Sequence, residues 1–430
     1  EHAFQVGRFL GWYYSQKHTE DSARIVIGKD TRRSSYMFEN ALAAGITSSG
    51  ADAYLLHVTT TPCVSYITRT ERFDCGVMIS ASHNPFYDNG IKLMNGVGEK
   101  MDDALQAELE AFIDGDPAYL PWATEGKVGK TIDFYSGRNR YIGYLTSLPS
   151  RSFEKHKVGL DCANGSSWMI GRAVFDALGA KTYVINDQPD GVNINTDCGS
   201  THIEGLQLYV REHHLDVGFA FDGDADRCLL VDEQGGVIDG DKVLAVCGSD
   251  MKRRGKLSGG TIVATVMSNL GLHEFCRENG VGLVCTSVGD RNVLEKMNEC
   301  GYKLGGEQSG HTIFTDYATT GDGQLTALQF LDVLARSGKK ASELASVCPQ
   351  YPQVLLNVAV SHERGVKDAI MASDALSAAI AEEEGKLSGE GRVLVRPSGT
   401  EALIRVMVEA KTEQIALLAA ENLVNVIKML

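Results

Sequence analysis

The chain has 430 residues, which is more than one hydrophobic core usually serves, so we expect several domains. Hydrophobic residues make up 43% of it and glycines number 46, a composition that excludes a disordered protein and favours a turn-rich α/β fold. The net charge of −15 argues against a nucleic-acid partner, because phosphate backbones require basic surfaces.

The cysteines and the hydropathy pattern indicate the cellular compartment in which we expect the protein. The ten cysteines are scattered singly, without a C-x-x-C pair or a zinc-type cluster, so we expect reduced thiols in a cytoplasmic protein. No apolar run approaches the roughly 18 residues of a membrane span and no signal peptide is present, so no membrane partner is expected. The chain opens at Glu1 inside a helical pattern, and we expect a few leading residues to be missing.

Three successive segments repeat the order strand, helix, strand with short glycine turns. The first is predicted to form strands at 23–27, 53–57 and 75–79 and a helix at 35–48. The second is predicted to form strands at 157–160, 181–185 and 215–221 with a helix near 169–178, and the third strands at 261–266 and 282–286 with helices at 270–278 and 292–300. This order is typical of a parallel sheet covered by helices, so we predict three similar α/β domains in tandem.

The last segment differs from the other three. It is predicted to form strands at 353–360, 392–396 and 403–410, one helix at 366–384 and a final amphipathic helix between Ile415 and Leu430. This is the pattern of a smaller α+β domain. The predicted domains are 1–136, 137–234, 235–349 and 350–430.

A polar loop follows the apolar strand that ends at Ile79. It contains Ser82, His83 and Lys92, and if the chain is an enzyme we expect its nucleophile here. Adjacent side chains rarely face each other, so a hydrolase triad would need a distant histidine and acid, and no G-x-S-x-G elbow surrounds either serine of the loop. From this loop alone, a βα turn with Asn-Pro punctuation is the alternative.

The predicted strand 215–221 ends in an acidic loop. Asp222, Asp224 and Asp226 alternate, so in an extended segment their carboxylates would point the same way and would need a cation to neutralise them. Oxygen-only ligands suit Mg²⁺. An EF-hand is rejected, because Arg227 stands where that loop needs glycine and a strand precedes it.

A glycine-rich loop spans 305–311. Its glycine spacing is wrong for a dinucleotide-binding turn. Glu307, Ser309 and His311 alternate, so in an extended loop they would converge on one side, as a polyhydroxy ligand such as a sugar requires. A plain hairpin connection is equally compatible with this segment.

The last polar loop lies between the predicted strands 392–396 and 403–410. It presents fixed charge, hydroxyls and exposed backbone N–H groups through Arg396, Pro397, Ser398, Gly399, Thr400 and the nearby Arg405. Such a set makes a phosphate-binding nest, and the alternative is a simple Ser-Gly-Thr turn beside an incidental arginine. Together the four loops supply what phosphoryl transfer on a sugar phosphate needs.

In these loops the sequence resembles the α-D-phosphohexomutases. The segments at 80–85, 222–227, 306–311 and 396–401 are similar to that family's active-serine, metal, sugar and phosphate loops, in the same order. Further stretches are most similar to the branch of the family that acts on glucosamine phosphates, and these lie at 86–92, 288–297, 319–323 and 404–409.

The resemblance implies three α/β domains and a smaller fourth around a central cleft, in a homodimer. It implies interconversion of glucosamine 6-phosphate and glucosamine 1-phosphate through a bound 1,6-bisphosphate, which also primes the enzyme. Ser82 would carry the phosphoryl group, and with Asp222, Asp224 and Asp226 it would hold one Mg²⁺. Lys92 would be a general acid or base, with His83 and Arg227 completing the catalytic set. The substrate would contact Glu307, Ser309, His311, the 396–400 loop and Arg405.

The sequence departs from the family pattern at one place, and two alternative functions remain open. The family's amino-terminal stretch Phe-Gly-Thr-Asp-Gly-Ile-Arg-Gly, which brings an arginine to the site, does not precede Glu1, and we expect truncation or disorder of this stretch. Lys29-Asp30-Thr31-Arg32 matches a family loop, so Arg32 is expected to face the cleft. The rivals are a mutase of the same family that prefers mannose or glucose phosphates, and a non-catalytic phosphosugar-binding protein.

Overall fold

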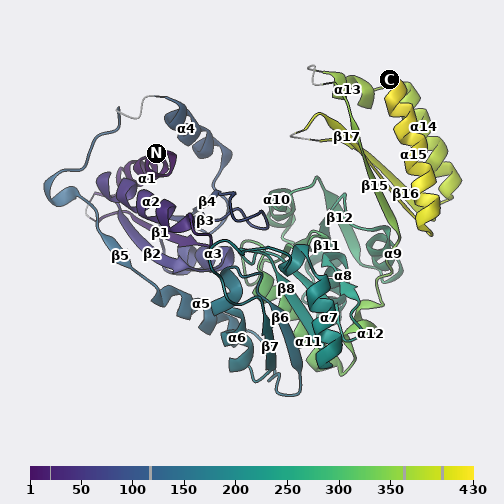
Figure 1. Ribbon diagram of the computed structural model, residues 1–430, viewed down its shortest axis with the longest axis horizontal. Helices are drawn as coiled ribbons and strands as arrows, with labels where there is room; N and C mark the ends of the chain where they lie inside the picture. The colour runs from purple at the N-terminus through teal and green to yellow at the C-terminus, as the bar shows by residue number, and fades with distance from the viewer. Residues whose placement is uncertain (20, 116–118, 362–364, 399–400) are drawn as a thin grey trace. The chain divides into compact units, whose positions relative to one another are not determined.

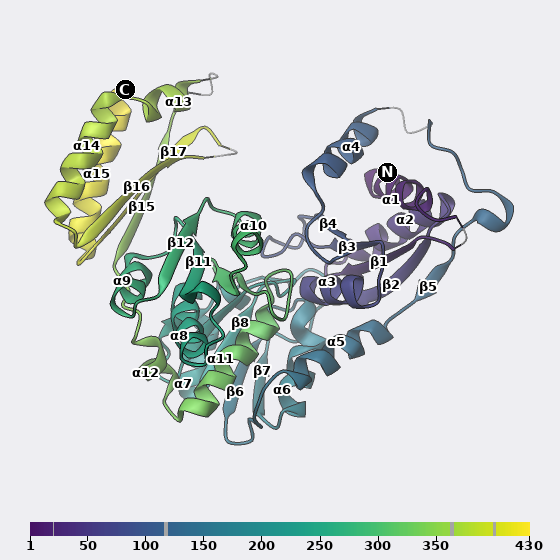
Figure 2. The ribbon, with the colours of Figure 1, turned by 180° about the vertical axis from the view of Figure 1, so that it is seen from behind.

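The computed structural model describes residues 1–19, 21–115, 119–361, 365–398 and 401–430. The chain divides into two compact units, and each is described by itself. Unit 1 contains Glu1–Met267 and Val281–Val347, and unit 2 contains Ser268–Gly280 and Cys348–Leu430. Within the described residues, three sheets belong to unit 1 and one to unit 2 (Figures 1 and 2).

The first sheet of unit 1 has the strand order β4-β3-β1-β2-β5. Its strands are β1 (Arg24–Lys29), β2 (Asp52–Val58), β3 (Cys75–Ile79), β4 (Ile91–Asn95) and β5 (Thr131–Asp133), and its helices are α1 (His2–Ser15), α2 (Ser35–Ser48), α3 (Thr61–Thr70) and α4 (Asp103–Asp114). The pairs are parallel except for β4, which runs antiparallel to β3. Every residue of β3 is buried, which explains its continuously apolar sequence.

The second sheet has the order β10-β9-β8-β6-β7. It comprises β6 (Lys157–Asp161), β7 (Lys181–Ile185), β8 (Val217–Phe221), β9 (Cys228–Asp232) and β10 (Val237–Ile238), accompanied by α5 (Ser136–Ser147), α6 (Gly171–Ala177) and α7 (Glu204–His213). β6 pairs in parallel with β7 and β8, whereas β9 is antiparallel to β8. Short 3-10 turns of unit 1 lie at Glu125–Lys127, Ser166–Met169, Gly199–Thr201 and Ser258–Gly260.

The third sheet has the order β12-β11-β13-β14. It comprises β11 (Thr261–Thr265), β12 (Gly282–Thr286), β13 (Leu304–Gly306) and β14 (Thr312–Phe314), with α8 (Gly240–Arg253), α10 (Asp290–Cys300), α11 (Gly323–Ser337) and α12 (Ala341–Ala345). β12 and β13 flank β11 in parallel, and β14 is antiparallel to β13.

Unit 2 is an antiparallel sheet in the order β15-β17-β16. It comprises β15 (Gln353–Ala359), β16 (Gly391–Pro397) and β17 (Leu403–Ala410), with α9 (Leu270–Glu278), α13 (Val366–Met371), α14 (Asp374–Leu387) and α15 (Glu413–Met429). The helices α14 and α15 share one core with the sheet, and Ile404, Val406, Val408 and Leu423 lie in it. These alternating strand positions leave Arg405 to the opposite face of β17.

The four polar loops occupy equivalent places in the fold. Residues 80–90 join β3 to β4, 222–227 join β8 to β9, 307–311 join β13 to β14 and 398–402 join β16 to β17. Each pair of strands is antiparallel. The predicted parallel pairing is confirmed for the inner strands of the three α/β sheets, and each of these sheets also has antiparallel strands. A βα turn after Ile79 is wrong, because the loop leads into the neighbouring antiparallel strand β4 and needs no crossover helix.

The predicted α/β and α+β segments are confirmed. One predicted helix is wrong, since 366–384 forms two helices, α13 and α14. The chain is extended at Ser373, whose side chain accepts a hydrogen bond from the Leu376 N–H and caps α14. Among the described residues, no helix combines the length and the apolar character needed to cross a membrane.

Candidate active site

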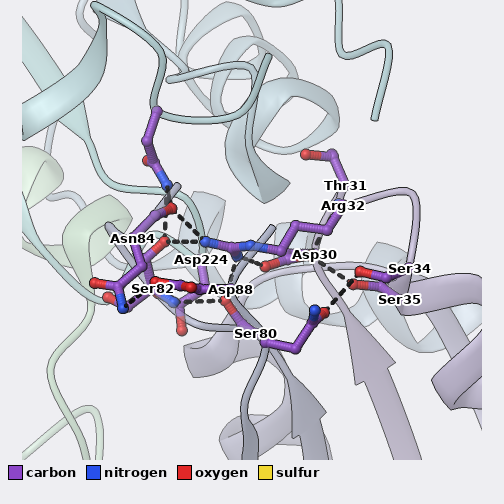
Figure 3. Close-up of polar contacts among 12 residues, drawn as sticks. Asp30, Thr31, Arg32, Ser34, Ser35, Ser80, Ser82, Asn84, Asp88 and Asp224 are labelled. Carbon is purple, nitrogen blue, oxygen red and sulfur yellow. Dashed lines mark hydrogen bonds and ion pairs between the residues drawn. The ribbon is translucent and has the colours of Figure 1, made fainter. Parts of the chain in front are cut away.

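The serine loop holds Ser82 in an unusual backbone conformation. Its φ is 51°, in the left-handed region that residues with a Cβ seldom adopt, and its N–H donates to Ser80 Oγ at 2.9 Å. The hydroxyl of Ser82 donates to Asp222 Oδ2 at 2.6 Å. A serine predicted to be the nucleophile thus lies directly beside the predicted metal site (Figure 3).

The three aspartates of the acidic loop are all buried, and one carboxylate oxygen from each lies within 4.8 Å of the other two. The segment is not extended as expected, because Ala225 has a φ of 57° and its N–H donates to the Asp222 carbonyl at 3.1 Å. A tight turn therefore brings the carboxylates together. Gly223 permits the close approach of the two loops, since a Cβ there would lie 2.6 Å from the Ser82 carbonyl oxygen.

The acidic cluster could hold a metal ion. Among the described side chains, Asp224 Oδ1 and Asp226 Oδ1 are buried oxygens without a hydrogen-bond partner. Burial, and then the charges of Asp226 and Asp224, raise the pKa of Asp222 well above its usual range. Uncompensated carboxylate oxygens in a buried cluster fit a hard cation, and three such oxygens are the ligands it prefers.

Lys92 extends from β4 into the same cluster. Its Nζ lies 2.5 Å from Asp224 Oδ2 and 3.1 Å from Asp226 Oδ2. Burial acts to lower the pKa of Lys92, but Asp224 and Asp226 outweigh it, and the pKa is raised. Lys92 is therefore protonated while these carboxylates are uncompensated, and neutralising them would lower its pKa.

His83 and Arg227 approach each other across the two loops. Arg227 Nη1 lies 3.5 Å from His83 Nδ1, and the Arg227 N–H donates to Asp222 Oδ1 at 3.2 Å. Partial burial of the ring and the Arg227 charge lower the pKa of His83. His83 lies beside this arginine, whereas the hydroxyl of Ser82 has Asp222 as its partner, an arrangement unlike a hydrolase triad.

The glycine-rich loop is a tight hairpin rather than an extended segment. The Glu307 N–H donates to the His311 carbonyl at 2.9 Å, and Gly310 takes a φ of 94°. Glu307 Oε1 accepts from the Gly289 N–H at 3.1 Å, and Ser309 is exposed. The hairpin thus presents Ser309 outward while its neighbour Glu307 is anchored.

His311 lies beneath this hairpin. It is buried, and its Nε2 accepts the Gly321 N–H at 3.1 Å. Its Nδ1 lies 4.0 Å from Asp226 Oδ2 and its Nε2 lies 3.8 Å from Asp290 Oδ2. His311 therefore links the acidic cluster to the first residue of α10. Sequence reasoning missed Asp290, although an acidic residue that opens a helix after glycine is a recognisable signal.

The phosphate loop belongs to unit 2. Arg396 and Arg405 are direct cross-strand partners on β16 and β17. Burial and the neighbouring Arg405 lower the pKa of Arg396, as expected for two like charges side by side. Lys367 adds a third cation, donating to the carbonyls of Ser398 at 2.7 Å and Glu401 at 3.1 Å. Such a cluster favours an anion; the predicted Gly399 and Thr400 lie outside the described residues.

Models of four protein domains match nearly the whole chain. They are the phosphoglucomutase/phosphomannomutase alpha/beta/alpha domains I, II and III and the C-terminal domain, at residues 1–119, 139–236, 239–351 and 355–426. The chain belongs to the phosphoglucomutase/phosphomannomutase family. The resemblance inferred from the four loops is confirmed.

Named relatives of this family cover the whole chain. It is 58% identical over 429 residues to a phosphoglucosamine mutase of Lachnospira eligens and 47% identical over 428 residues to one of Acetivibrio thermocellus. These alignments cover 100% of this chain and 94% and 95% of the relatives.

Solved structures of phosphoglucomutase/phosphomannomutase proteins share the fold. A family member from Burkholderia thailandensis matches with a TM-score of 0.81 at 22% identity, covering 99% of this chain and 93% of that one. The N-acetylphosphoglucosamine mutase of Aspergillus fumigatus, in complex with GlcNAc-6P and magnesium, matches with a TM-score of 0.69 at 20% identity, covering 86% and 92%.

Three buried polar residues support this family's serine and metal loops, and sequence reasoning missed their roles. Arg32, expected to face a cleft, is fully buried beneath the serine loop and donates to its carbonyls (Figure 3). The Thr61 hydroxyl donates to Asp224 Oδ2, and Asn195 donates to the Ser82 carbonyl. Their signals are weak, because single polar residues far apart in sequence do not show what they contact.

Proposed function

We propose that this protein interconverts glucosamine 6-phosphate and glucosamine 1-phosphate through a phosphoserine at Ser82. The observation that carries the proposal is the hydrogen bond of 2.6 Å between the Ser82 hydroxyl and Asp222, within a buried carboxylate cluster suited to a cation. Relatives 47–58% identical over the whole chain are named phosphoglucosamine mutase, which supports the choice among family activities.

In the first half-reaction, a substrate hydroxyl attacks the phosphorus carried by Ser82. The new bond forms between that oxygen and phosphorus, the bond to Ser82 Oγ breaks, and the product is a 1,6-bisphosphate. The attacking hydroxyl loses one proton and Ser82 Oγ gains one as its bond to phosphorus breaks, so the step is proton-neutral. We propose that Lys92, which holds a proton beside Asp224 and Asp226, donates to the leaving oxygen and recovers a proton from the attacking hydroxyl. In the second half-reaction, the reoriented bisphosphate returns its other phosphoryl group to Ser82. A bisphosphate of the hexosamine or of glucose would therefore also prime an unphosphorylated chain.

We propose Mg²⁺ as the bound metal, held by Asp222, Asp224 and Asp226 together with the phosphoryl oxygens on Ser82. When bound, Mg²⁺ would offset the negative charge of the phosphoryl group and of the three carboxylates. Its oxygen-only ligand set supports this choice. The fungal relative of the same fold was solved with magnesium.

The sugar would contact Glu307 and Ser309, and its non-reacting phosphate the arginines of unit 2. Gln308, between these two residues, donates from Nε2 to Asp239 Oδ2 at 3.2 Å. This contact directs the amide N–H groups of Gln308 to Asp239 and leaves its carbonyl oxygen as an acceptor. An acceptor beside a carboxylate suits the ammonium group of glucosamine better than an amide donor would.

A coupled assay tests the proposal. Full-length protein primed with glucose 1,6-bisphosphate should convert glucosamine 6-phosphate faster than glucose or mannose phosphates, and EDTA should abolish the activity until Mg²⁺ is restored. Faster conversion of a glucose or mannose phosphate would show that this sugar phosphate, and not glucosamine 6-phosphate, is the preferred substrate. Binding of glucosamine 6-phosphate without conversion of any hexose phosphate would instead indicate a phosphosugar-binding protein.

A further inference from the structure

Two carbonyl oxygens of the serine loop are each held by the same two side chains. Arg32 Nη2 donates to the carbonyls of Ser82 at 3.2 Å and Asn84 at 2.5 Å. Asn195 Nδ2 donates to the same carbonyls at 2.9 Å and 3.0 Å. The two donors thus converge on one pair of acceptors, at the residue whose hydroxyl contacts Asp222.

The two donors come from different sheets of unit 1. Arg32 follows β1 of the first sheet, and Asn195 lies after β7 of the second. Both are buried, with 0% and 7% of their surfaces exposed. Asn195 is itself held by its N–H, which donates to the Ala163 carbonyl at 2.9 Å, and it takes a left-handed φ of 59°, which asparagine tolerates better than most residues.

We propose that Asn195 and Arg32 are positioning residues that lock the serine loop onto the acidic loop and so set the place of the Ser82 hydroxyl. A serine in the left-handed region is strained and needs surrounding contacts to persist. Four hydrogen bonds to two adjacent carbonyls supply that restraint. The Asn195 amide also lies against the acidic loop, since a Cβ at Gly223 would lie 2.9 Å from Asn195 Nδ2. The inference rests on the proposed function of Ser82 and goes beyond it, because it assigns a role to side chains that hold the backbone of the loop.

Asn195 offers the cleaner test of the two, because Arg32 also forms a buried ion pair with Asp30. Asn195→Asp keeps the shape of the side chain but replaces the amide donor with a carboxylate that the two carbonyls repel. Asn195→Ala removes the amide altogether and serves if the aspartate variant does not fold. The matched control is Asn193→Ala, whose amide donates to the Gln188 carbonyl at 3.0 Å instead of to the serine loop.

Both Asn195 variants should lower kcat by about 100-fold while KM stays within about threefold, because a misplaced nucleophile weakens the chemical step more than substrate binding. Transfer of phosphate from glucose 1,6-bisphosphate to Ser82, followed by intact-protein mass spectrometry, should slow to a similar degree. Amide hydrogen exchange at 80–90 should accelerate. Asn193→Ala should match the wild type in all three measurements.

Unchanged kcat and unchanged exchange at 80–90 in the Asn195 variants would overturn the proposal. So would a loss of melting temperature with normal phosphate transfer, which would mark Asn195 as merely structural. If primed wild type converts no hexose phosphate, the proposed function fails, and hydrogen exchange at 80–90 still decides whether Asn195 restrains the loop.

Discussion

At the residue scale, opposing charges are crowded around one hydroxyl. Ser82 contacts Asp222, while Lys92 contacts Asp224 and Asp226. Each acid is buried, so its charge depends on a partner cation or a proton. Lys92 and Arg227 supply part of that positive charge, and the proposed metal ion would bind at the carboxylate oxygens of Asp224 and Asp226 that lack a hydrogen-bond partner among the described residues.

Replacing the nucleophile should separate chemistry from folding. Ser82→Ala should lower kcat by at least about 1,000-fold, because no other group accepts the phosphoryl group. The melting temperature should change little, since the loop carbonyls remain held. Ser388→Ala is the control: Ser388 has the same left-handed φ of 51° but is exposed in unit 2, where its hydroxyl donates to the Gly385 carbonyl at 3.2 Å. Near-normal turnover by Ser82→Ala would place the nucleophile elsewhere.

Arg405 belongs to the same scale, although it lies in unit 2. Arg405→Ala should raise KM for the sugar phosphate by about 10-fold with a smaller change in kcat, because it removes a charge-assisted contact to the non-reacting phosphate. Lys411→Ala removes a cation that pairs on the surface with Glu390 and should leave both constants unchanged. Steady-state kinetics of both variants make the comparison, and an unchanged KM in Arg405→Ala would contradict the phosphate role.

At the element scale, every candidate loop joins two neighbouring antiparallel strands of one sheet. Because each loop joins neighbouring strands, its polar residues are closely spaced.

A side chain that caps one helix can also hold a neighbouring helix. Asp322 caps α11 by accepting from the Leu325 N–H at 2.9 Å, and it accepts from the Tyr141 hydroxyl of α5 at 2.6 Å. One buried carboxylate thus connects two helices.

This cap should make folding stability pH-dependent. Burial raises the pKa of Asp322 from its ordinary 3.8 to about 6 in the folded chain. Between these values the unfolded chain releases a proton that the folded chain retains, so the contribution of Asp322 falls by about 2.5 kcal/mol as pH rises from 4 to 7. Denaturant unfolding of the wild type and Asp322→Asn should show this slope in the wild type only. Equal pH slopes of the unfolding free energy in the wild type and in Asp322→Asn would contradict this prediction.

At the scale of the whole molecule, one helix packs with a different unit from the one that its neighbours in sequence belong to. The family model of domain III spans 239–351 and includes α9, yet α9 belongs to unit 2. The buried Glu409 of β17 explains this, because it accepts from Asn269 Nδ2 at 3.1 Å and from the Leu270 N–H at 2.9 Å and pairs with Arg392. The helix is thereby attached to the sheet of unit 2.

Removing that carboxylate should release α9. Glu409→Ala should lower the free energy of unfolding by about 2–4 kcal/mol, because buried donors lose a charged acceptor. Hydrogen exchange should accelerate within 268–280. Glu390→Ala, which removes the exposed partner of Lys411, should change neither quantity. Unchanged protection of 268–280 in Glu409→Ala would show that α9 is held by other contacts.

The sequence by itself determined the chemistry and most of the elements. Residue types in four short loops sufficed to predict a nucleophile, a cation site and anion contacts, because local spacing reports local backbone and charge. Only the tertiary structure decided that Asp222 to Asp226 form a turn, that a single predicted helix breaks at Ser373, and that Arg32 and Asn195 reach the serine loop. The contacts of Arg32 and Asn195 with Ser82 join residues 50 and 113 positions apart, and no local pattern in the sequence records which distant carbonyl a buried donor finds.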